Sequence, residues 1–139
     1  MSKQSEATRL LAPEKAVFLV TMDESGRPDA RAMAVVMHEE FKTIWMMTGK
    51  SSDKYQELSR NPNCMLYATE MEDTENYLEL RLWGRVELLD DAESRAKTWR
   101  EDYSCYFPGG KDDPDLCVMK FTANSGTVQT LAGKEKLAV

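Results

Sequence analysis

The chain has few of the residues that metal sites, disulfide frameworks and nucleophilic side-chain catalysis require. It contains a single histidine, His38, and three widely spaced cysteines, Cys64, Cys105 and Cys117. Cysteines at this spacing form neither a disulfide framework nor a C-x-x-C metal site. A Ser-His-Asp or Cys-His system would have to use His38, which lies at the end of a predicted strand. We therefore expect no metal site, and an organic cofactor fits the chemistry better than side-chain catalysis.

An excess of basic residues and a long apolar run are also missing from the sequence. The 18 Lys and Arg residues are outnumbered by 24 Asp and Glu residues, which gives a formal net charge of -6. Nucleic-acid and anionic-membrane surfaces need a basic footprint, so neither is an expected partner. The first apolar run, Ala16–Met22, is too short to span a bilayer and matches a signal peptide poorly. A reducing cytoplasm is the simplest setting.

Two nucleotide-binding fingerprints are missing as well. The triplet Gly49-Lys50-Ser51 is not a P-loop, because the first glycine of G-x-x-x-x-G-K-[ST] would fall at Ile44. A Rossmann fingerprint is absent, so a nicotinamide-binding domain is not predicted.

What the chain does have is a predicted strand, turn and helix start between residues 43 and 60, ended by Asn61-Pro62. A helix start leaves backbone N–H groups unpaired and carries the positive end of the helix dipole, so it favours an anion. A phosphate cradle could be completed there by the side chains of Thr48, Ser51, Ser52 and either Lys50 or Lys54. The alternative is that Ser51 or Ser52 only caps the helix and that the lysines are solvated.

The rest of the chain alternates between short strands and turns. Strands are predicted over residues 16–23, 29–38, 43–48, 63–70, 77–89, 116–123 and 127–131, and helices over 5–11, 52–60 and 92–103. Residues 124–126 are predicted to turn, and residues 132–139 to form a loose tail after one domain that spans the chain. Strands joined by short turns predict a mainly β fold, an antiparallel β-barrel with α-helices packed outside it.

Small residues recur along one face of the second predicted strand, at Ala30, Ala32 and Ala34. A row of alanines indicates that something comes close to the backbone. A tightly curved barrel wall and a flat ligand along the strand edge would both require this.

The strand over residues 77–89 has the cleanest alternation in the chain, with leucines on the core face. Gly84 in its middle predicts a bulge or a barrel corner. Trp83 stands between Arg81 and Arg85 on the other face, a composition typical of an interface.

In the order and spacing of its motifs, the chain resembles the FMN-binding split-barrel superfamily related to pyridoxamine 5'-phosphate oxidase, most of all the general-stress-protein branch. The motifs that carry the resemblance are Thr21-Met-Asp-Glu-Ser-Gly-Arg-Pro, Arg31-Ala-Met-Ala, Thr48-Gly-Lys-Ser-Ser52-Asp-Lys54, Asn61-Pro62, Trp83-Gly84-Arg85-Val86, Phe107-Pro108-Gly109-Gly110 and Asp113-Pro114. The family implies a homodimer of six-stranded antiparallel split barrels, with FMN at each subunit boundary.

Carried over by position, the resemblance implies FMN-binding roles for Arg31, Ala32, Met33, Ala34, Met47, Thr48, Ser52, Lys54 and Glu79. The cationic and hydroxyl side chains of this set would bind the phosphate end. The backbone of residues 32–34 and of Met47 would run along the isoalloxazine. Glu79 would reach the flavin of the partner subunit, with Trp83 nearby.

The activity that the resemblance implies is an FMN-dependent oxidoreductase that acts on an unidentified small molecule by hydride or electron transfer. The basic C-terminal segment that holds pyridoxal phosphate in the oxidases has no counterpart in residues 127–139, so vitamin B6 oxidation is not expected. Asp53 and Glu79 add negative charge near the predicted flavin and favour an alternative, a non-enzymatic dimeric barrel with another ligand or none. A third possibility, a haem-binding barrel, has only His38 as a nitrogen ligand.

Overall fold

The computed structural model describes residues 3–139. In chain order its elements are α1 (Lys3–Ala7), the 3-10 helix η1 (Thr8–Leu11), β1 (Ala16–Met22), β2 (Pro28–Ala34), β3 (Met37–Glu39), β4 (Thr43–Gly49), α2 (Asp53–Arg60), β5 (Asn63–Met71), β6 (Tyr77–Leu89), α3 (Ala92–Thr98), the 3-10 helices η2 (Glu101–Cys105) and η3 (Gly110–Asp112), β7 (Leu116–Thr130) and β8 (Gly133–Lys136). Within residues 3–139, no helix combines the length and the apolar character needed to cross a membrane.

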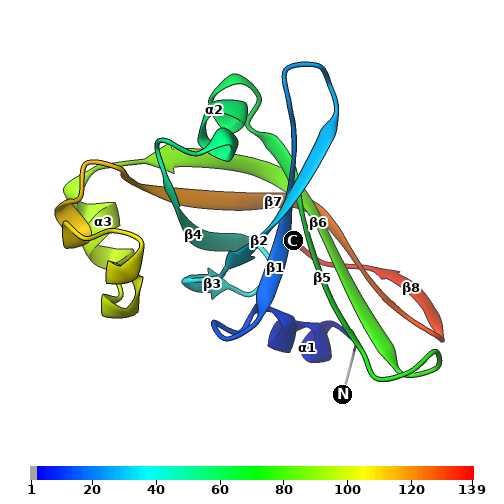
Figure 1. Ribbon diagram of the computed structural model, residues 1–139. Coiled ribbons are helices and arrows are strands. Elements are labelled where there is room, and N and C mark those ends of the chain that lie inside the picture. The colour runs from blue at the N-terminus through cyan, green and yellow to red at the C-terminus, as the bar shows by residue number, and fades with distance from the viewer. Residues whose placement is uncertain (1–2) are drawn as a thin grey trace.

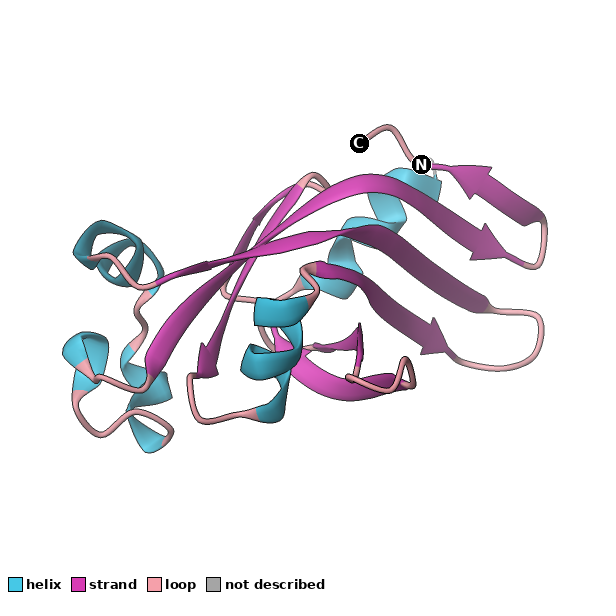
Figure 2. Ribbon diagram, turned by 90° about the horizontal axis from the view of Figure 1, so that it is seen from above, coloured by secondary structure: helices cyan, strands magenta, loops and turns pink. Residues whose placement is uncertain are grey.

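The strands form one curled antiparallel sheet in the order β2-β1-β5-β6-β7-β4-β3, with β8 added to β7. Within residues 3–139 the sheet therefore has eight strands, not the six that the resemblance implies, whereas the mainly β fold and the antiparallel pairing are confirmed. β2 and β3 end the order on opposite sides, although they follow each other in the chain. No strand pairing among the described residues joins β2 to β4, so an open seam remains between them. α3 and the 3-10 helices η2 and η3 lie at one end of the long strands β6 and β7, and β8 lies at the other (Figure 1 and Figure 2).

The predicted strand over residues 29–38 is in fact two strands, β2 and β3, separated by Val35 and Val36. The chain changes partner at this point: β2 pairs with β1, while the N–H of Val36 bonds the carbonyl of Trp45 on β4 at 2.8 Å. The side chain of Val35 is buried in the core and fixes the corner. This corner is what places β2 and β4 on the two sides of the seam.

The turn predicted at residues 124–126 is a bulge within the continuous strand β7. The register of β7 on β6 shifts between Trp83 and Gly84, which leaves Asn124 without an opposite residue. The bulge predicted at Gly84 is therefore confirmed. A Cβ at position 84 would lie 2.1 Å from the carbonyl oxygen of Thr122, so only glycine fits here.

The segment predicted as a loose tail is ordered. β8 pairs with β7, and the N–H of Leu137 bonds the carbonyl of Gly126 at 2.9 Å. Leu137 is only 8% exposed and packs in the main core, which is the physical reason that the tail is held down.

The helix predicted over residues 92–103 ends earlier, at Thr98. Trp99 has an extended backbone and packs against a small second core that contains Trp45 and Phe107. The chain then continues as η2 and η3, which cover the end of the sheet beside the seam.

Candidate functional site

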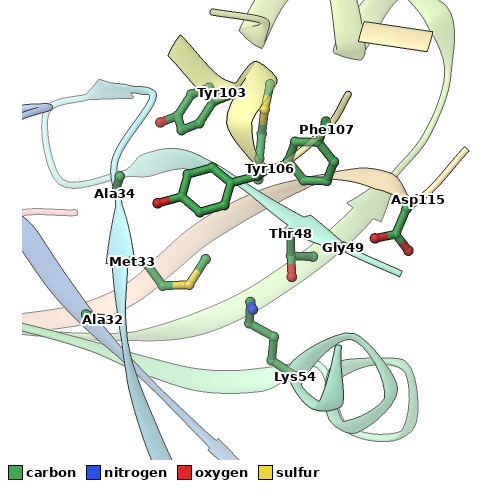
Figure 3. Close-up of a pocket in the computed structure, with 11 residues that line it drawn as sticks. Ala32, Met33, Ala34, Thr48, Gly49, Lys54, Tyr103, Tyr106, Phe107 and Asp115 are labelled. Carbon is green, nitrogen blue, oxygen red and sulfur yellow. The ribbon is translucent and has the colours of Figure 1, made fainter. Parts of the chain in front are cut away.

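A cavity of about 360 Å³ lies at the seam between β2 and β4 (Figure 3). It is lined by Ala32, Met33, Ala34, Met47, Thr48, Gly49, Lys54, Tyr103, Tyr106, Phe107 and Asp115. The two strands supply its side walls, and α2 supplies Lys54. The segment around η2 covers the cavity with three aromatic side chains, Tyr103, Tyr106 and Phe107, which we call the roof. This volume is in the range of pockets that hold small molecules and cofactors.

Six of the nine predicted cofactor-binding residues surround this one cavity: Ala32, Met33, Ala34, Met47, Thr48 and Lys54. Ser52 lies directly behind them, with its hydroxyl 3.0 Å from that of Thr48. Arg31 and Glu79 do not line the cavity. Their roles in binding FMN stay predictions.

The β2 wall exposes backbone to the cavity. Ala32 and Ala34 are exposed and present no side chain beyond Cβ. Among the described strands β2 pairs with β1 alone, so its second edge has backbone groups available for a ligand. Of the two explanations for the alanine row, the flat ligand along the strand edge would have a cavity beside this strand to occupy.

The α2 start is capped by Ser52, whose Oγ accepts the N–H of Tyr55 at 3.3 Å. The Ser52 hydroxyl in turn donates to the carbonyl of Gly49 at 2.7 Å. Helix capping by Ser52 is therefore confirmed. The other part of that alternative, that the lysines are solvated, does not hold, because Lys50 is ion-paired and Lys54 is partly buried. Lys50 points elsewhere, because its Nζ forms an ion pair with Asp90 at 2.7 Å.

Asp115 occupies two of the hydrogen-bond donors that the predicted phosphate cradle would use. Its Oδ1 accepts the N–H of Ser51 at 2.9 Å, and its Oδ2 accepts the Ser51 hydroxyl at 3.2 Å. The carboxylate of Asp115 lies so close to Gly49 that a Cβ at position 49 would be 2.5 Å from Oδ2 of Asp115. The turn before α2 is thus held by a carboxylate that also lines the cavity.

Lys54 is the cation of the cavity. It is half-buried and, within residues 3–139, forms no hydrogen bond or ion pair. Burial lowers the pKa of the Lys54 ammonium below its ordinary value, and the positive charge of Arg31 lowers it further. A partly desolvated cation beside a second cation, with no bonded counter-charge, is an arrangement that favours an anionic ligand.

Arg31 is held by protein groups beside the cavity. Its guanidinium donates to Thr21 Oγ1 at 2.7 Å, to Asp29 Oδ2 at 2.8 Å and to Glu57 Oε1 at 3.3 Å. The side chain is 20% exposed, and its positive charge still acts on Lys54.

Glu79 lies on the outer face of β6. The hydroxyl of Tyr67 donates to its Oε2, and Arg81 donates to the same oxygen at 3.4 Å while its guanidinium packs over the Tyr67 ring. Trp83, 39% exposed, lies on the same face. The charge of Glu79 is therefore balanced within the chain.

Sequence reasoning missed the roof and one wall of the cavity, which consist of Tyr103, Tyr106, Phe107 and Asp115. Their local sequence carries a weak signal, an aromatic pair directly before Pro108-Gly109-Gly110. His38 does not line the cavity, and its Nδ1 lies 3.1 Å from the carbonyl oxygen of Glu40.

Comparisons with known proteins agree with the fold. The family described as "Pyridoxamine 5'-phosphate oxidase like" matches residues 3–138. General stress protein 26 of Bacillus subtilis (strain 168) is 30% identical over 99 residues, which are 70% of this chain and 67% of that protein. A pyridoxine/pyridoxamine 5'-phosphate oxidase of Burkholderia mallei (strain SAVP1) is 36% identical over 92 residues, which are 64% of this chain but only 40% of that enzyme.

A solved structure resembles the whole chain. The crystal structure of a protein from Clostridium acetobutylicum related to general stress protein 26 superposes with a TM-score of 0.85 and 28% identity, covering 100% of this chain and 97% of that one. With the family match over residues 3–138, these relatives establish that the chain belongs to the pyridoxamine 5'-phosphate oxidase like family, in the branch related to general stress protein 26.

Proposed function

We propose that this protein binds FMN in the seam cavity and acts as an FMN-dependent oxidoreductase on a small molecule. The observation that carries the proposal is Lys54, a half-buried ammonium in the cavity wall with no bonded counter-charge among residues 3–139. A phosphate is the chemical group that such a cation at a helix start suits best. Membership of the family supports a flavin phosphate over other anions.

The residues present fit FMN along the rest of the cavity. Lys54 and the hydroxyl of Thr48 would hold the phosphate at one end. The small side chains of Ala32 and Ala34 and the free edge of β2 leave room for a flat ring with polar edges, and Met47 gives the opposite wall an apolar surface. When bound, FMN supplies hydride or electron transfer at its isoalloxazine ring, while the protein orients it.

We also propose that the protein is a homodimer. The outer face of β1, β5 and β6 exposes Phe18, Met22 and Trp83, large apolar side chains of a kind enriched in interfaces. Glu79 lies on this face and away from the cavity of its own chain. A second copy packed here would bury the apolar side chains and put Glu79 at the contact between the subunits, where the resemblance places it near the flavin of the partner. Sedimentation velocity tests this proposal, and a monomer would contradict it.

The alternative is a non-enzymatic dimeric barrel whose cavity takes another ligand or none. Asp115 favours it, because a carboxylate that already occupies the Ser51 N–H repels a phosphate. The visible absorption spectrum of the purified protein separates the two. A flavin band, with FMN identified by mass after denaturation, is the expected result. A colourless protein that takes up no FMN when it is added would contradict the proposed function.

A further inference from the structure

We infer that the roof of the seam cavity binds a planar, uncharged, conjugated ring compound with ring carbonyl groups, a quinone-like ligand stacked on the ring of Tyr106. This inference rests on the proposed function, because it assumes that FMN occupies the walls and the Lys54 end of the cavity. It adds a substrate class and a residue that selects it.

The roof is made of three aromatic side chains, Tyr103, Tyr106 and Phe107, that face the cavity from one short segment. Tyr106 is 73% exposed, so most of its ring is uncovered within the chain. Figure 3 shows this ring spread between Met33 and Phe107, with Lys54 on the far side of the cavity. A large exposed ring that lines a pocket offers a stacking surface to a flat ligand.

The roof is held in a fixed conformation. The N–H groups of Tyr106 and Phe107 both donate to the carbonyl of Tyr103 at 3.0 Å, and Phe107 is buried in the second core. Arg95, itself buried, donates to the carbonyls of Lys111 and Asp113 at 2.9 and 2.8 Å and so holds the segment that follows. Because the backbone of the segment is held before any ligand arrives, stacking on Tyr106 has to order the side chain of this residue but not the segment that carries it.

The charges in the cavity argue against an anionic partner for the roof. Among the described residues that line the cavity, Lys54 and Asp115 are the two with charged side chains. In the proposed complex Lys54 is used by the FMN phosphate, which leaves Asp115 and no further cation. Arg100, which packs over the Tyr103 ring, is paired with Asp102. A second phosphate or carboxylate would therefore lack a partner and meet like charge.

The roof does offer a neutral hydrogen-bond donor. Burial raises the pKa of the Tyr103 phenol above its ordinary value, so the hydroxyl keeps its proton at neutral pH. In Figure 3 the hydroxyls of Tyr103 and Tyr106 both lie on the β2 side of the cavity. Ring carbonyl oxygens of a ligand stacked on Tyr106 are the acceptors that suit them.

The test is calorimetric titration of the apoprotein and the FMN-loaded protein with tetramethyl-1,4-benzoquinone and, separately, with pyridoxine 5'-phosphate. The quinone is fully substituted, so it does not alkylate the exposed thiol of Cys105. Pyridoxine 5'-phosphate is planar but anionic and has no aldehyde to react with Lys54. Wild-type protein is compared with Tyr106→Ala and with Tyr106→Phe, which keeps the ring.

We expect the FMN-loaded protein to bind the quinone more tightly than pyridoxine 5'-phosphate. Tyr106→Ala should weaken quinone binding about three- to tenfold, while Tyr106→Phe stays close to wild type. Because Tyr106 lines the same cavity, Tyr106→Ala should weaken FMN binding less than it weakens quinone binding, and Tyr106→Phe should bind FMN like wild type. Unchanged quinone binding in Tyr106→Ala, tighter binding of pyridoxine 5'-phosphate, or an equal loss of FMN affinity would overturn the inference.

The two proposals fail in different ways. FMN binding without quinone binding overturns the roof inference and leaves the proposed function standing. If FMN does not bind, the proposed function fails, and the roof is then judged on the apoprotein. Quinone binding to the apoprotein that is lost in Tyr106→Ala and kept in Tyr106→Phe would support the roof as a binding site. No quinone binding to the apoprotein would contradict the roof inference as well.

Discussion

Arg31 on β2 donates a hydrogen bond from Nη2 to Oε1 of Glu57 on α2, at 3.3 Å. Glu57 is only 5% exposed and also accepts the hydroxyl of Thr21 at 2.9 Å. The contact joins the strand that supplies one wall of the cavity to the helix that carries Lys54. It therefore helps to hold α2 against the sheet at the Lys54 end of the cavity, even though neither residue lines the cavity.

Glu57→Ala should lower the free energy of unfolding by about 2–3 kcal/mol, because it leaves the half-buried Arg31 and the buried Thr21 hydroxyl without this acceptor. Glu57→Gln keeps an acceptor oxygen and should cost less. Urea unfolding measures both, and equal stability of Glu57→Ala and wild type would show that the contact does not hold α2 on the sheet.

Lys54→Ala should weaken FMN binding about tenfold or more, since a hydrogen bond to a charged group contributes roughly 1.5–3 kcal/mol. Lys50→Ala is the matched control, because Lys50 lies four residues earlier but is paired with Asp90. It should keep nearly full affinity. Equal losses in the two variants would point to general electrostatic attraction instead of a phosphate contact at Lys54.

Arg31→Ala is also expected to weaken FMN binding about tenfold or more if its charge reaches the phosphate as the resemblance implies. Because Arg31 is bonded to Asp29, Thr21 and Glu57, the variant must be compared with Glu57→Ala. A loss in Arg31→Ala that Glu57→Ala reproduces in full would assign Arg31 a positioning role. If both Lys54→Ala and Arg31→Ala bound FMN like wild type, the phosphate assignment would be wrong.

Asp115→Asn should tighten FMN binding by several-fold. The amide oxygen can still accept the N–H of Ser51, while the negative charge beside the phosphate is removed. Between unit charges about 4 Å apart and screened by water, such a repulsion is worth about 1 kcal/mol. Fluorescence quenching of FMN measures the effect. Weaker binding in this variant would mean that the carboxylate is needed for a reason other than holding the turn.

The affinity for FMN should depend on pH through Lys54. Its pKa is lowered in the free protein from the ordinary 10.5 and should rise when a phosphate binds, since the opposite charge favours the ammonium. Affinity is therefore highest below the pKa of Lys54 in the free protein and falls as the pH rises through it, starting below 10.5. Lys54→Arg should remove this fall, because a guanidinium does not titrate in that range. A profile that is the same in both proteins would exclude Lys54 as the titrating group.

The site residues that were predicted from the sequence include a group whose members are close to one another in the chain. Thr48, Ser52 and Lys54 lie within one strand, turn and helix start, so their proximity follows from secondary structure alone. The alternation of residues 77–89 likewise determines which face of β6 is buried. Such short-range patterns are enough to predict the elements and one end of the cavity.

The roof depends on contacts between residues that are distant in the chain. Tyr106 and Asp115 reach the cavity because buried Arg95 and the second core hold residues 103–116 against the end of the sheet. No periodic pattern marks these positions. In β7, Asn124-Ser125-Gly126 has the composition of a turn, yet pairing with β6 carries the strand through it as a bulge. Tertiary pairing overrode local preference there.

The central claim, that the cavity binds FMN, is tested most directly by titrating the apoprotein with FMN and following the fluorescence of the flavin. We predict saturable quenching with an equimolar end point, weakened in Lys54→Ala and retained in Lys50→Ala. Fluorescence that stays that of free FMN throughout the titration, in a protein shown to be folded by circular dichroism, would contradict the account and favour a barrel with another ligand.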